Sequence, residues 1–127
     1  MEIKRGDIIL VELCNVGGSI QNGLRPCCVV SNALNNKYSP NLTVVPLTSR
    51  VMKKQMPTHI TLTKDMYPIH TDSIVLCEQI MTIDKARVSG DALFSLNQLE
   101  MKRLDRAMMI QLGVESAHPV TQSRKVM

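Results

Sequence analysis

Short aliphatic runs bounded by turn-forming residues constrain the fold of this chain more than any other feature. Runs that are rich in Val, Ile, Leu and Thr and separated by Gly, Pro, Asn and Asp are typical of β-strands. Strands this closely spaced favour a small, strongly bent antiparallel sheet or barrel. The sequence predicts strands over residues 7–14, 26–31, 42–48, 57–63 and 73–83, followed by a short one near 87–93.

The connections between these strands differ in character. Residues 15–24 form a glycine-rich loop whose length, in a compact domain, indicates function or mobility. Pro26 is expected to open the second strand, and Pro46 within 42–48 predicts an edge position or a bulge, because proline cannot donate to a ladder. Residues 32–41 predict a polar connection with one helical turn.

One helix is predicted, over residues 96–112. Ser95 and Gln98 have the S-x-x-Q spacing of a capping box, and Gly113 can end the helix. Residues 114–127 have little apolar content and no periodicity, so they predict a flexible tail. The apolar residues that recur at helical spacing are Leu96, Leu99, Leu104, Ala107, Met108 and Leu112.

Length and composition indicate one domain, residues 1–113, that is mainly β with helices. The chain has 127 residues, of which 44% are hydrophobic and 20% are charged, as in ordinary soluble domains. Its formal net charge of +4 is compatible with a polyanionic partner. The charged start MEIKRGD and the absence of an apolar run of ~20 residues argue against a signal peptide or a membrane span, so we expect a cytoplasmic protein.

The cysteines and aromatic residues limit the chemistry further. Free buried thiols are expected at the four cysteines, and no CxxC pair or Cys/His cluster predicts a metal or another cofactor. Aromatic residues are too few for a row of stacking platforms, so a nucleic acid would be held by charge, hydrogen bonds and groove shape. The cysteines are Cys14, Cys27, Cys28 and Cys77, and the aromatic residues are Tyr38, Tyr67 and Phe94.

A series of short motifs follows one order along residues 2–113. The series is KRGDIILVEL, GSIQNGLRP, VVSN, a YSP connector, VPLTSR, PTHI, EQIMTIDK and a closing LGV. In this order the chain resembles the MazF/PemK family of toxin endoribonucleases. The resemblance implies an SH3-like, CcdB/PemK-type small barrel with a C-terminal helix that forms a homodimer. It also implies metal-independent cleavage of single-stranded RNA, usually mRNA, at short motifs, neutralised by a cognate MazE-like antitoxin whose loss arrests bacterial growth.

The resemblance implies that Arg25 and Thr48 are the catalytic residues. In metal-free cleavage the 2′-hydroxyl of RNA attacks the adjacent phosphate, and negative charge grows on the phosphate oxygens. The planar donors of Arg25 suit two of those oxygens, and because arginine keeps its proton near neutral pH we assign it to charge stabilisation rather than to a general base. The Thr48 hydroxyl can relay a proton to the leaving 5′-oxygen. Without the resemblance, Arg25 would be interpreted as a solvated strand start and Thr48 as a β-branched strand end.

Further RNA contacts are predicted in loops and at strand ends. Ordinary turn and surface roles compete with RNA contact at Ser19, Asn32, Ser49, Arg50 and Gln79. A basic rim is predicted at Lys53 and Lys54, with a looser contribution from Arg124 and Lys125.

Three alternatives remain open at this level. His59 and His70 together would be an acid–base pair for RNA cleavage, although a structural role is expected for His59 in the PTHI segment. The same barrel fold also occurs in a non-enzymatic toxin that poisons DNA gyrase, which has no need of Arg25 and Thr48. A family member that only binds RNA or an antitoxin is the third alternative.

Overall fold

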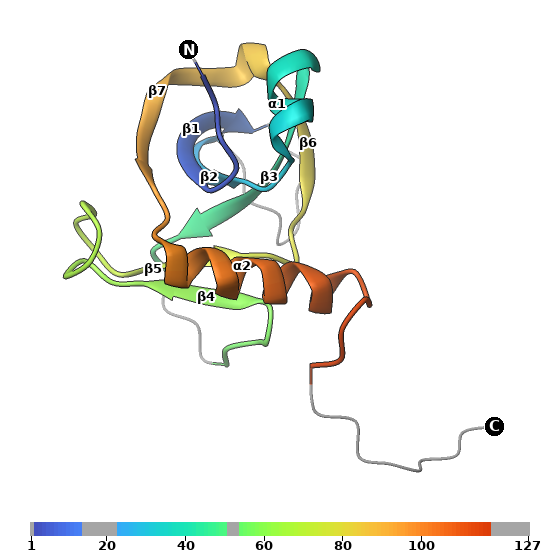
Figure 1. Cartoon of the computed structure of the whole chain (residues 1–127). Coiled ribbons are helices and arrows are strands. Elements are labelled where there is room, and N and C mark those ends of the chain that lie inside the picture. Colours follow the sequence, from blue (N-terminus) through green and yellow to red (C-terminus); the bar gives the residue numbers. More distant parts are fainter. Residues whose placement is uncertain (1, 14–22, 51–53, 118–127) are drawn as a thin grey trace.

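A strongly curled antiparallel sheet of seven strands forms most of the structure (Figure 1). The computed structural model describes residues 2–13, 23–50 and 54–117. The elements are β1 (Asp7–Leu13), β2 (Gly23–Val29), α1 (Ala33–Tyr38), β3 (Asn41–Thr48), β4 (His59–Leu62), β5 (Ser73–Leu76), β6 (Met81–Asp84), the 3-10 turn η1 (Lys85–Arg87), β7 (Val88–Ser95) and α2 (Gln98–Gln111).

The strand order is β4-β5-β3-β2-β1-β7, with β6 also paired to β3. The predicted class, mainly β with helices and a long helix near the end, is confirmed, as is the short helical turn between β2 and β3. Within the described residues, β4 and β7 end the strand order and do not pair with each other. The architecture is therefore a curled sheet rather than a closed barrel.

Strand β3 is the central strand, and it changes partner along its length. One side pairs with β2, while the other side pairs with β6 over Asn41–Val44 and with β5 at Leu47 and Thr48. Pro46 is fully buried and stands where the partner changes. The prediction that Pro46 marks an edge or a bulge is therefore wrong. Its missing N–H falls in the gap between two partners, where the ladder needs no donor.

The single strand predicted over residues 73–83 is also wrong, because a turn at residues 77–80 divides it into β5 and β6. In this turn the Gln79 N–H donates to the Leu76 carbonyl at 3.0 Å. The Cys77 N–H donates to the Thr58 carbonyl at 3.1 Å. These two backbone hydrogen bonds direct the chain from one partner segment of β3 to the other.

Strand β2 begins at Gly23, three residues before the predicted start at Pro26. Gly23 has a positive φ of 82°, a conformation that favours glycine. Pro26 pairs with Leu10 of β1, and Arg25 pairs with Val11. Because pairing with β1 continues past the proline, Arg25 lies inside a strand and not at its mouth.

Helix α2 has a different cap from the predicted one. Asn97 is the N-cap, and its side-chain oxygen accepts from the Glu100 N–H at 2.9 Å. Ser95 ends β7, and its hydroxyl donates to Asp7 at 2.6 Å, so the predicted capping box with Gln98 does not form. Gly113, with a φ of 77°, follows the helix end as predicted.

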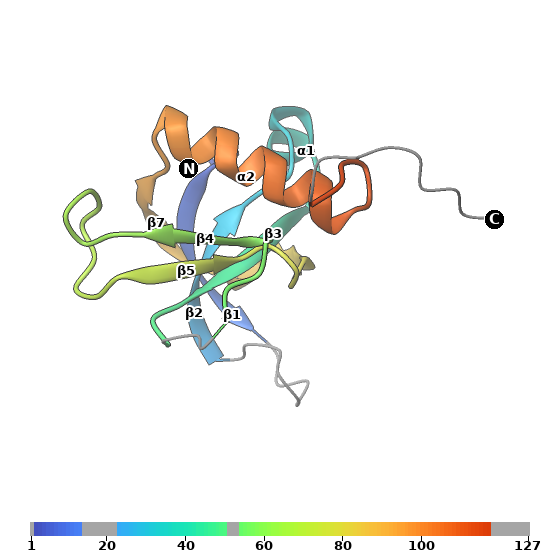
Figure 2. The ribbon, with the colours of Figure 1, turned by 90° about the horizontal axis from the view of Figure 1, so that it is seen from below.

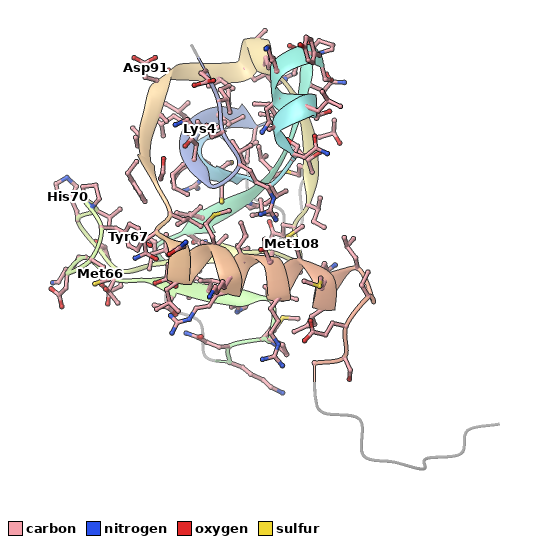
Figure 3. The ribbon with its side chains drawn as sticks, viewed as in Figure 1. Lys4, Met66, Tyr67, His70, Asp91 and Met108 are labelled. Carbon is pink, nitrogen blue, oxygen red and sulfur yellow. The ribbon has the colours of Figure 1, made fainter. Side chains whose placement is uncertain are left out.

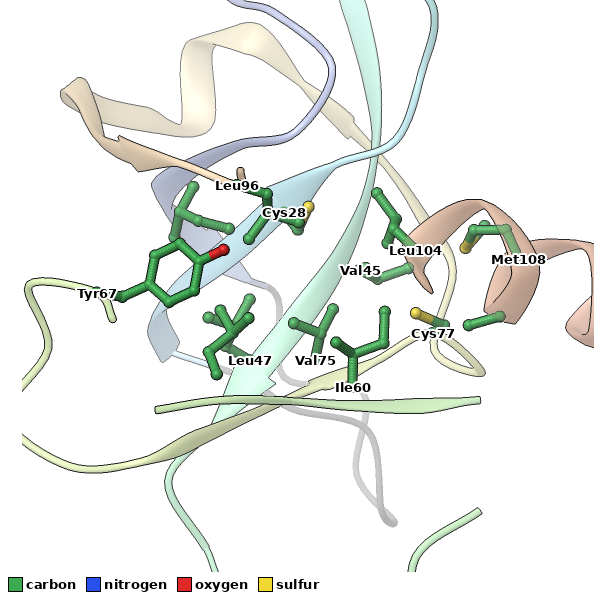
Figure 4. Close-up of a cluster of buried hydrophobic side chains, with 13 residues drawn as sticks. Cys28, Val45, Leu47, Ile60, Tyr67, Val75, Cys77, Leu96, Leu104 and Met108 are labelled. Atoms are coloured by element: carbon green, nitrogen blue, oxygen red, sulfur yellow. The ribbon is translucent and has the colours of Figure 1, made fainter. Parts of the chain in front are cut away.

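Two groups of buried side chains form the core, one on each face of the sheet. The helix cluster lies between the sheet and α2, and Figure 4 shows Leu104 and Met108 of α2 facing strand residues there. The curl cluster lies on the opposite face of the curled strands. Neighbours alternate between the clusters, as strand geometry requires: Cys28 belongs to the helix cluster and Cys27 to the curl cluster. Representative members are Val45, Ile60 and Val75 in the helix cluster, and Ile9, Val11, Leu42 and Val44 in the curl cluster.

The C-terminal part of the described chain leaves α2 and turns back. Glu115 forms an ion pair with Arg106 at 3.3 Å. Residues 118–127 of the predicted tail lie outside the described residues, and the division into a domain over 1–113 and a tail stays a prediction. Among the described residues, no helix is both long and apolar enough to cross a membrane.

Candidate functional site

Arg25 and Thr48 lie at the same end of neighbouring strands. Cys27 of β2 pairs with Pro46 of β3, and the β2–β3 pairing ends there. Arg25 lies two residues before Cys27, and Thr48 lies two residues after Pro46. Figure 2 shows the start of β2 and the end of β3 on the side of the molecule away from α2. Both residues continue the face of the curl cluster, because each is two positions from a paired residue on that face.

Pro26 stands where the β2–β3 ladder ends. It precedes Cys27, the last residue of β2 that pairs with β3. The Val30 N–H donates to the Thr43 carbonyl of β3, so by strand alternation the nitrogen of Pro26 also faces β3, where it has no N–H to donate. Beyond this point the two strands are no longer held together by the ladder, which leaves room between Arg25 and Thr48.

The two side chains have opposite exposure. Arg25 is exposed, whereas Thr48 is 6% exposed. The Thr48 hydroxyl oxygen accepts from the Arg50 N–H at 3.1 Å. Because a hydroxyl has one donor and two acceptor positions, its O–H can still donate. The arrangement combines an exposed cation with an oriented hydroxyl.

Ser49 and Arg50 follow Thr48 in the chain, and Gln79 lies in the turn between β5 and β6, which both pair with β3. Met81 of β6 pairs with Val44, and continuing that register places Gln79 opposite Pro46. Gln79 is half-buried in the turn between β5 and β6. Ser49 and Arg50 follow β3 directly and are exposed.

Ser49 also lines a hollow of about 460 Å³ on the opposite face, together with Pro26, Leu47 and His70. Leu47, which lines this hollow, belongs to the helix cluster. The hollow therefore lies on the helix-cluster face of the sheet, and the sheet separates it from the face that carries Arg25. It therefore does not belong to the same face as the candidate pair.

Asn32 lies at the other end of β2. It is the N-cap of α1, and its side-chain oxygen accepts from the Asn35 N–H at 2.8 Å. Val29 alone is four residue steps along β2 from Arg25, which corresponds to about 13 Å. The fold therefore does not bring Asn32 together with Arg25 and Thr48.

Four of the other predicted positions lie outside the described residues, and one is exposed. Ser19 and Lys53 lie outside the described residues, as do Arg124 and Lys125 of the tail. Lys54 is exposed in the connector before β4. Only Lys54 of the predicted basic rim can therefore be placed.

The two histidines are not paired. His70 lies in the loop between β4 and β5, which Figure 3 shows projecting from the body of the molecule. His59 begins β4, at the other end of that hairpin, and its side chain is 3% exposed. Both ring nitrogens of His59 have protein partners: the Met56 N–H donates to Nδ1 at 3.1 Å, and Nε2 lies 3.0 Å from Glu78. The structural role expected for His59 agrees with these contacts.

Glu78 directly precedes Gln79, and no role was predicted for it from the sequence. One carboxylate oxygen contacts His59, and the other accepts from the Thr58 hydroxyl at 3.2 Å. Its side chain is 23% exposed. The motifs PTHI and EQIMTIDK contain these partners, but only the fold shows that they meet.

The described cysteines are inert core residues. Cys27, Cys28 and Cys77 are buried free thiols, as predicted, while Cys14 lies outside the described residues. Burial raises the pKa of Cys27 and the pKa of Cys77 to about 12 each, and it also raises the pKa of Cys28. Thiols held in the neutral form are poor nucleophiles and poor metal ligands. Within the same described part of the chain, no group of three His, Cys, Asp or Glu side chains is arranged to hold a metal ion.

The chain matches a known family over most of its length. Residues 4–112 match the family described as PemK-like, MazF-like toxin of type II toxin-antitoxin system. The chain therefore belongs to this toxin family, and the resemblance seen in the motifs is confirmed.

Solved structures show the same fold. The chain is similar to MazF from Deinococcus radiodurans (Form-I), with a TM-score of 0.73 and 21% identity over 89% of this chain and 98% of that one. It is similar to a mycobacterial endoribonuclease in complex with its cognate antitoxin, with a TM-score of 0.69 and 24% identity over 89% and 97% of the two chains. The MazE–MazF complex from Deinococcus radiodurans (Form-II) gives a TM-score of 0.68 and 23% identity over 91% and 99%.

Proposed function

We propose that this protein is a sequence-specific endoribonuclease that cleaves single-stranded RNA, including mRNA, in the cytoplasm and without a metal ion. The observation that supports the proposal is that Arg25 and Thr48 stand at the same end of the paired strands β2 and β3 in a member of the MazF-like toxin family. Similar folds occur in proteins described as endoribonucleases. The alternative of a gyrase-poisoning toxin gains no support from the site, since binding alone does not need this pair.

In the proposed reaction the 2′-hydroxyl of the RNA attacks the neighbouring phosphorus. The new bond joins the 2′-oxygen to phosphorus, the bond from phosphorus to the 5′-oxygen breaks, and a cyclic 2′,3′-phosphate and a 5′-hydroxyl result. The 2′-hydroxyl gives its proton to solvent water, the leaving 5′-oxygen receives one from a protein hydroxyl, and solvent water then returns a proton to that hydroxyl. The protein has to stabilise the additional charge on the phosphate oxygens and to supply the proton.

Arg25 performs the first task in this proposal. The residue is exposed in the part of β2 that pairs with β1 but no longer with β3, so a phosphate can approach it from solvent. A guanidinium presents parallel N–H donors that match two phosphate oxygens. Its strand position, opposite Val11, limits the directions in which the side chain can point.

Thr48 performs the second task. The Arg50 N–H occupies one lone pair of its hydroxyl oxygen and thereby orients the O–H. A threonine hydroxyl is a weak acid by itself, but a neighbouring cation and a developing alkoxide favour proton transfer from it. We assign Gln79, Ser49 and Arg50 to contacts with the RNA strand around this pair.

The proposal includes two protein partners. A MazE-like antitoxin is the expected inhibitor, because similar toxins occur in complexes with their antitoxins. A homodimer is the expected assembly, as the family resemblance implies. Both partners belong to the proposal and are testable by co-purification and by light scattering.

The decisive experiment measures cleavage of a long mixed-sequence RNA in EDTA. The wild-type protein is expected to cut at a limited set of motifs, and the cut sites report the specificity. Arg25→Ala is expected to lower the cleavage rate about 100–1000-fold, as the loss of one charge-stabilising contact typically does. Circular dichroism would show that the variant remains folded.

Arg106→Ala is the matched control, because it removes an exposed arginine that pairs with Glu115 at the far end of α2. It is expected to cleave at the wild-type rate. Full activity of Arg25→Ala would refute the site, and gyrase-dependent DNA damage without RNA cleavage would refute the function. RNA binding without cleavage by the wild-type protein would support the binding-only alternative instead.

A further inference from the structure

We propose that His59 and Glu78 form a positioning unit that holds Gln79 beside the end of β3, so that its amide can select an RNA base. The inference rests on the proposed function and deepens it. It gives a role to residues of the PTHI and EQIMTIDK motifs, neither of which contains Arg25 or Thr48.

Three hydrogen bonds join Thr58 and His59 to the turn that carries Gln79. Thr58 makes two of them, since its carbonyl accepts from the Cys77 N–H at 3.1 Å and its hydroxyl donates to Glu78 at 3.2 Å. His59 makes the third, with Glu78 at 3.0 Å, while its other ring nitrogen accepts from the Met56 N–H at 3.1 Å. The carboxylate is thus held through both oxygens, and the residue after it is Gln79.

The contacts of His59 also fix its tautomer. Since Nδ1 accepts from the Met56 N–H, the neutral ring carries its proton on Nε2, which donates to Glu78. A hydrogen bond to a carboxylate is stronger than one between neutral groups, and a side chain that is 3% exposed loses little of it to water. The Glu78 side chain is therefore held in place, directly before Gln79 in the chain.

The position of the turn explains why such a unit is needed. The turn lies opposite Pro46, where β3 has no N–H to offer and where neither β5 nor β6 is paired with it. The sheet ladder therefore cannot fix the turn at this point. The His59–Glu78 contacts supply the missing restraint on the turn. Pro46, which the turn faces, is two residues before Thr48 in β3.

Base selection depends on this restraint. A glutamine amide can donate and accept on one base edge, but only when its backbone and rotamer are held against the strand. A mobile turn would leave the phosphate chemistry of Arg25 intact and would weaken the preference between bases. Glu78 and His59 are positioning residues in this scheme, and Gln79 is the residue that contacts the RNA.

The test compares cleavage of short RNAs that contain the mapped cut motif with RNAs that differ from it by one base. Glu78→Gln and His59→Asn are expected to lower the ratio between cognate and substituted RNA about tenfold at one position of the motif. KM for the cognate RNA rises, while kcat stays within about threefold, since one lost binding contact removes uniform binding. His59→Gln, which keeps a donor at the position of Nε2, is expected to retain most of the preference.

Gln79→Ala and the control Asp105→Asn complete the set. Gln79→Ala is expected to lose the same base preference at the same position of the motif. The double variant Glu78→Gln, Gln79→Ala is expected to lose no more base preference than Gln79→Ala alone, because the two residues act as one unit. Asp105→Asn breaks another ion pair, with Arg5 at 2.6 Å, and is expected to leave the base preference unchanged. A purely structural role would lower the melting temperature of the Glu78 and Asp105 variants alike and change the base preference of neither.

A second measurement does not need activity. Amide hydrogen exchange at Gln79 and Cys77 is expected to accelerate in Glu78→Gln and not in Asp105→Asn. Unchanged base preference in active Glu78→Gln, or unchanged exchange at both amides, would overturn the inference. If the wild-type protein does not cleave RNA at all, the proposed function fails, while the exchange result still decides whether the turn is held by His59 and Glu78.

Discussion

The two ends of strand β2 carry similar polar residues but use them differently. At the α1 end, Asn32 caps a helix, and the Lys85 amine donates to the Asn36 carbonyl at 2.6 Å. Arg5 donates to the Val30 carbonyl at 2.9 Å. These side chains satisfy backbone groups that a helix terminus and a strand end would otherwise leave unpaired.

At the other end, the β2–β3 ladder stops at a proline, and the two polar side chains differ in exposure. Pro26 has no N–H to donate at this end of the ladder. Arg25 is exposed, whereas Thr48 is buried and its hydroxyl keeps a donor. The end where the ladder stops is therefore the one suited to hold a ligand, while the polar side chains of the α1 end serve the fold.

Thr48→Val is expected to have the largest effect on activity and tests whether the end of β3 is functional. Valine has nearly the shape of threonine and suits the buried strand end, so the fold should persist while the proton donor is lost. We expect RNA cleavage to fall about 100-fold or more, as for the loss of a general acid. Single-turnover cleavage assays measure the effect.

Thr48→Ser is the control for this substitution, because it keeps the hydroxyl and should restore much of the rate. Equal activity of Thr48→Val and wild type would show that the hydroxyl takes no part in the reaction. In that case the end of β3 would be no more functional than the α1 end.

Local patterns predicted the elements of this fold well. The alternation in PTHITLT places Ile60 and Leu62 in the helix cluster, and Gly113 follows the end of α2 as its position predicts. Such features depend on residues close in sequence. Ser95 and Asn97 show where this reasoning fails, since both suit a cap and only the contact of Ser95 with Asp7 of β1 decides between them.

The surroundings of the candidate site depend on contacts between residues far apart in the sequence, which local patterns do not predict. Pro46 is compatible with an edge strand until the partner change of β3 is known. Glu78 looks like an ordinary strand residue until Thr58 and His59 are seen to hold it. The family resemblance pointed to Arg25 and Thr48, but only the antiparallel pairing of β2 with β3 shows that the two residues stand at the same end of neighbouring strands.

Gly6→Ala tests the structural end with the next largest effect. Gly6 has a φ of 94°, and its N–H donates to the Val29 carbonyl at 2.8 Å, next to the α1 end of β2. An added Cβ would approach the Met101 sulfur to 2.5 Å, which the flexible methionine can relieve by moving. The left-handed conformation then costs about 1–2 kcal/mol of stability.

Urea unfolding would measure this loss, and the cleavage rate per folded molecule is expected to stay at the wild-type value. Gly90→Ala is a suitable reference, because Gly90 has a φ of 73° but no atom near an added Cβ. A larger loss in Gly6→Ala than in Gly90→Ala would measure the contribution of Met101. Reduced cleavage by folded Gly6→Ala would contradict the separation of the two ends.

Asn32→Ala gives the smallest expected effect and tests whether the α1 end touches RNA. The substitution removes the cap of a helix of six residues, for which the expected loss is about 1 kcal/mol. Asn32→Ser keeps a capping oxygen and should recover most of the stability, while both variants should bind RNA as the wild type does. Fluorescence anisotropy with a non-cleavable RNA measures binding separately from stability. If both variants bind RNA more weakly although Asn32→Ser is as stable as the wild type, Asn32 contacts the strand, and the RNA path extends along β2 from Arg25 to α1.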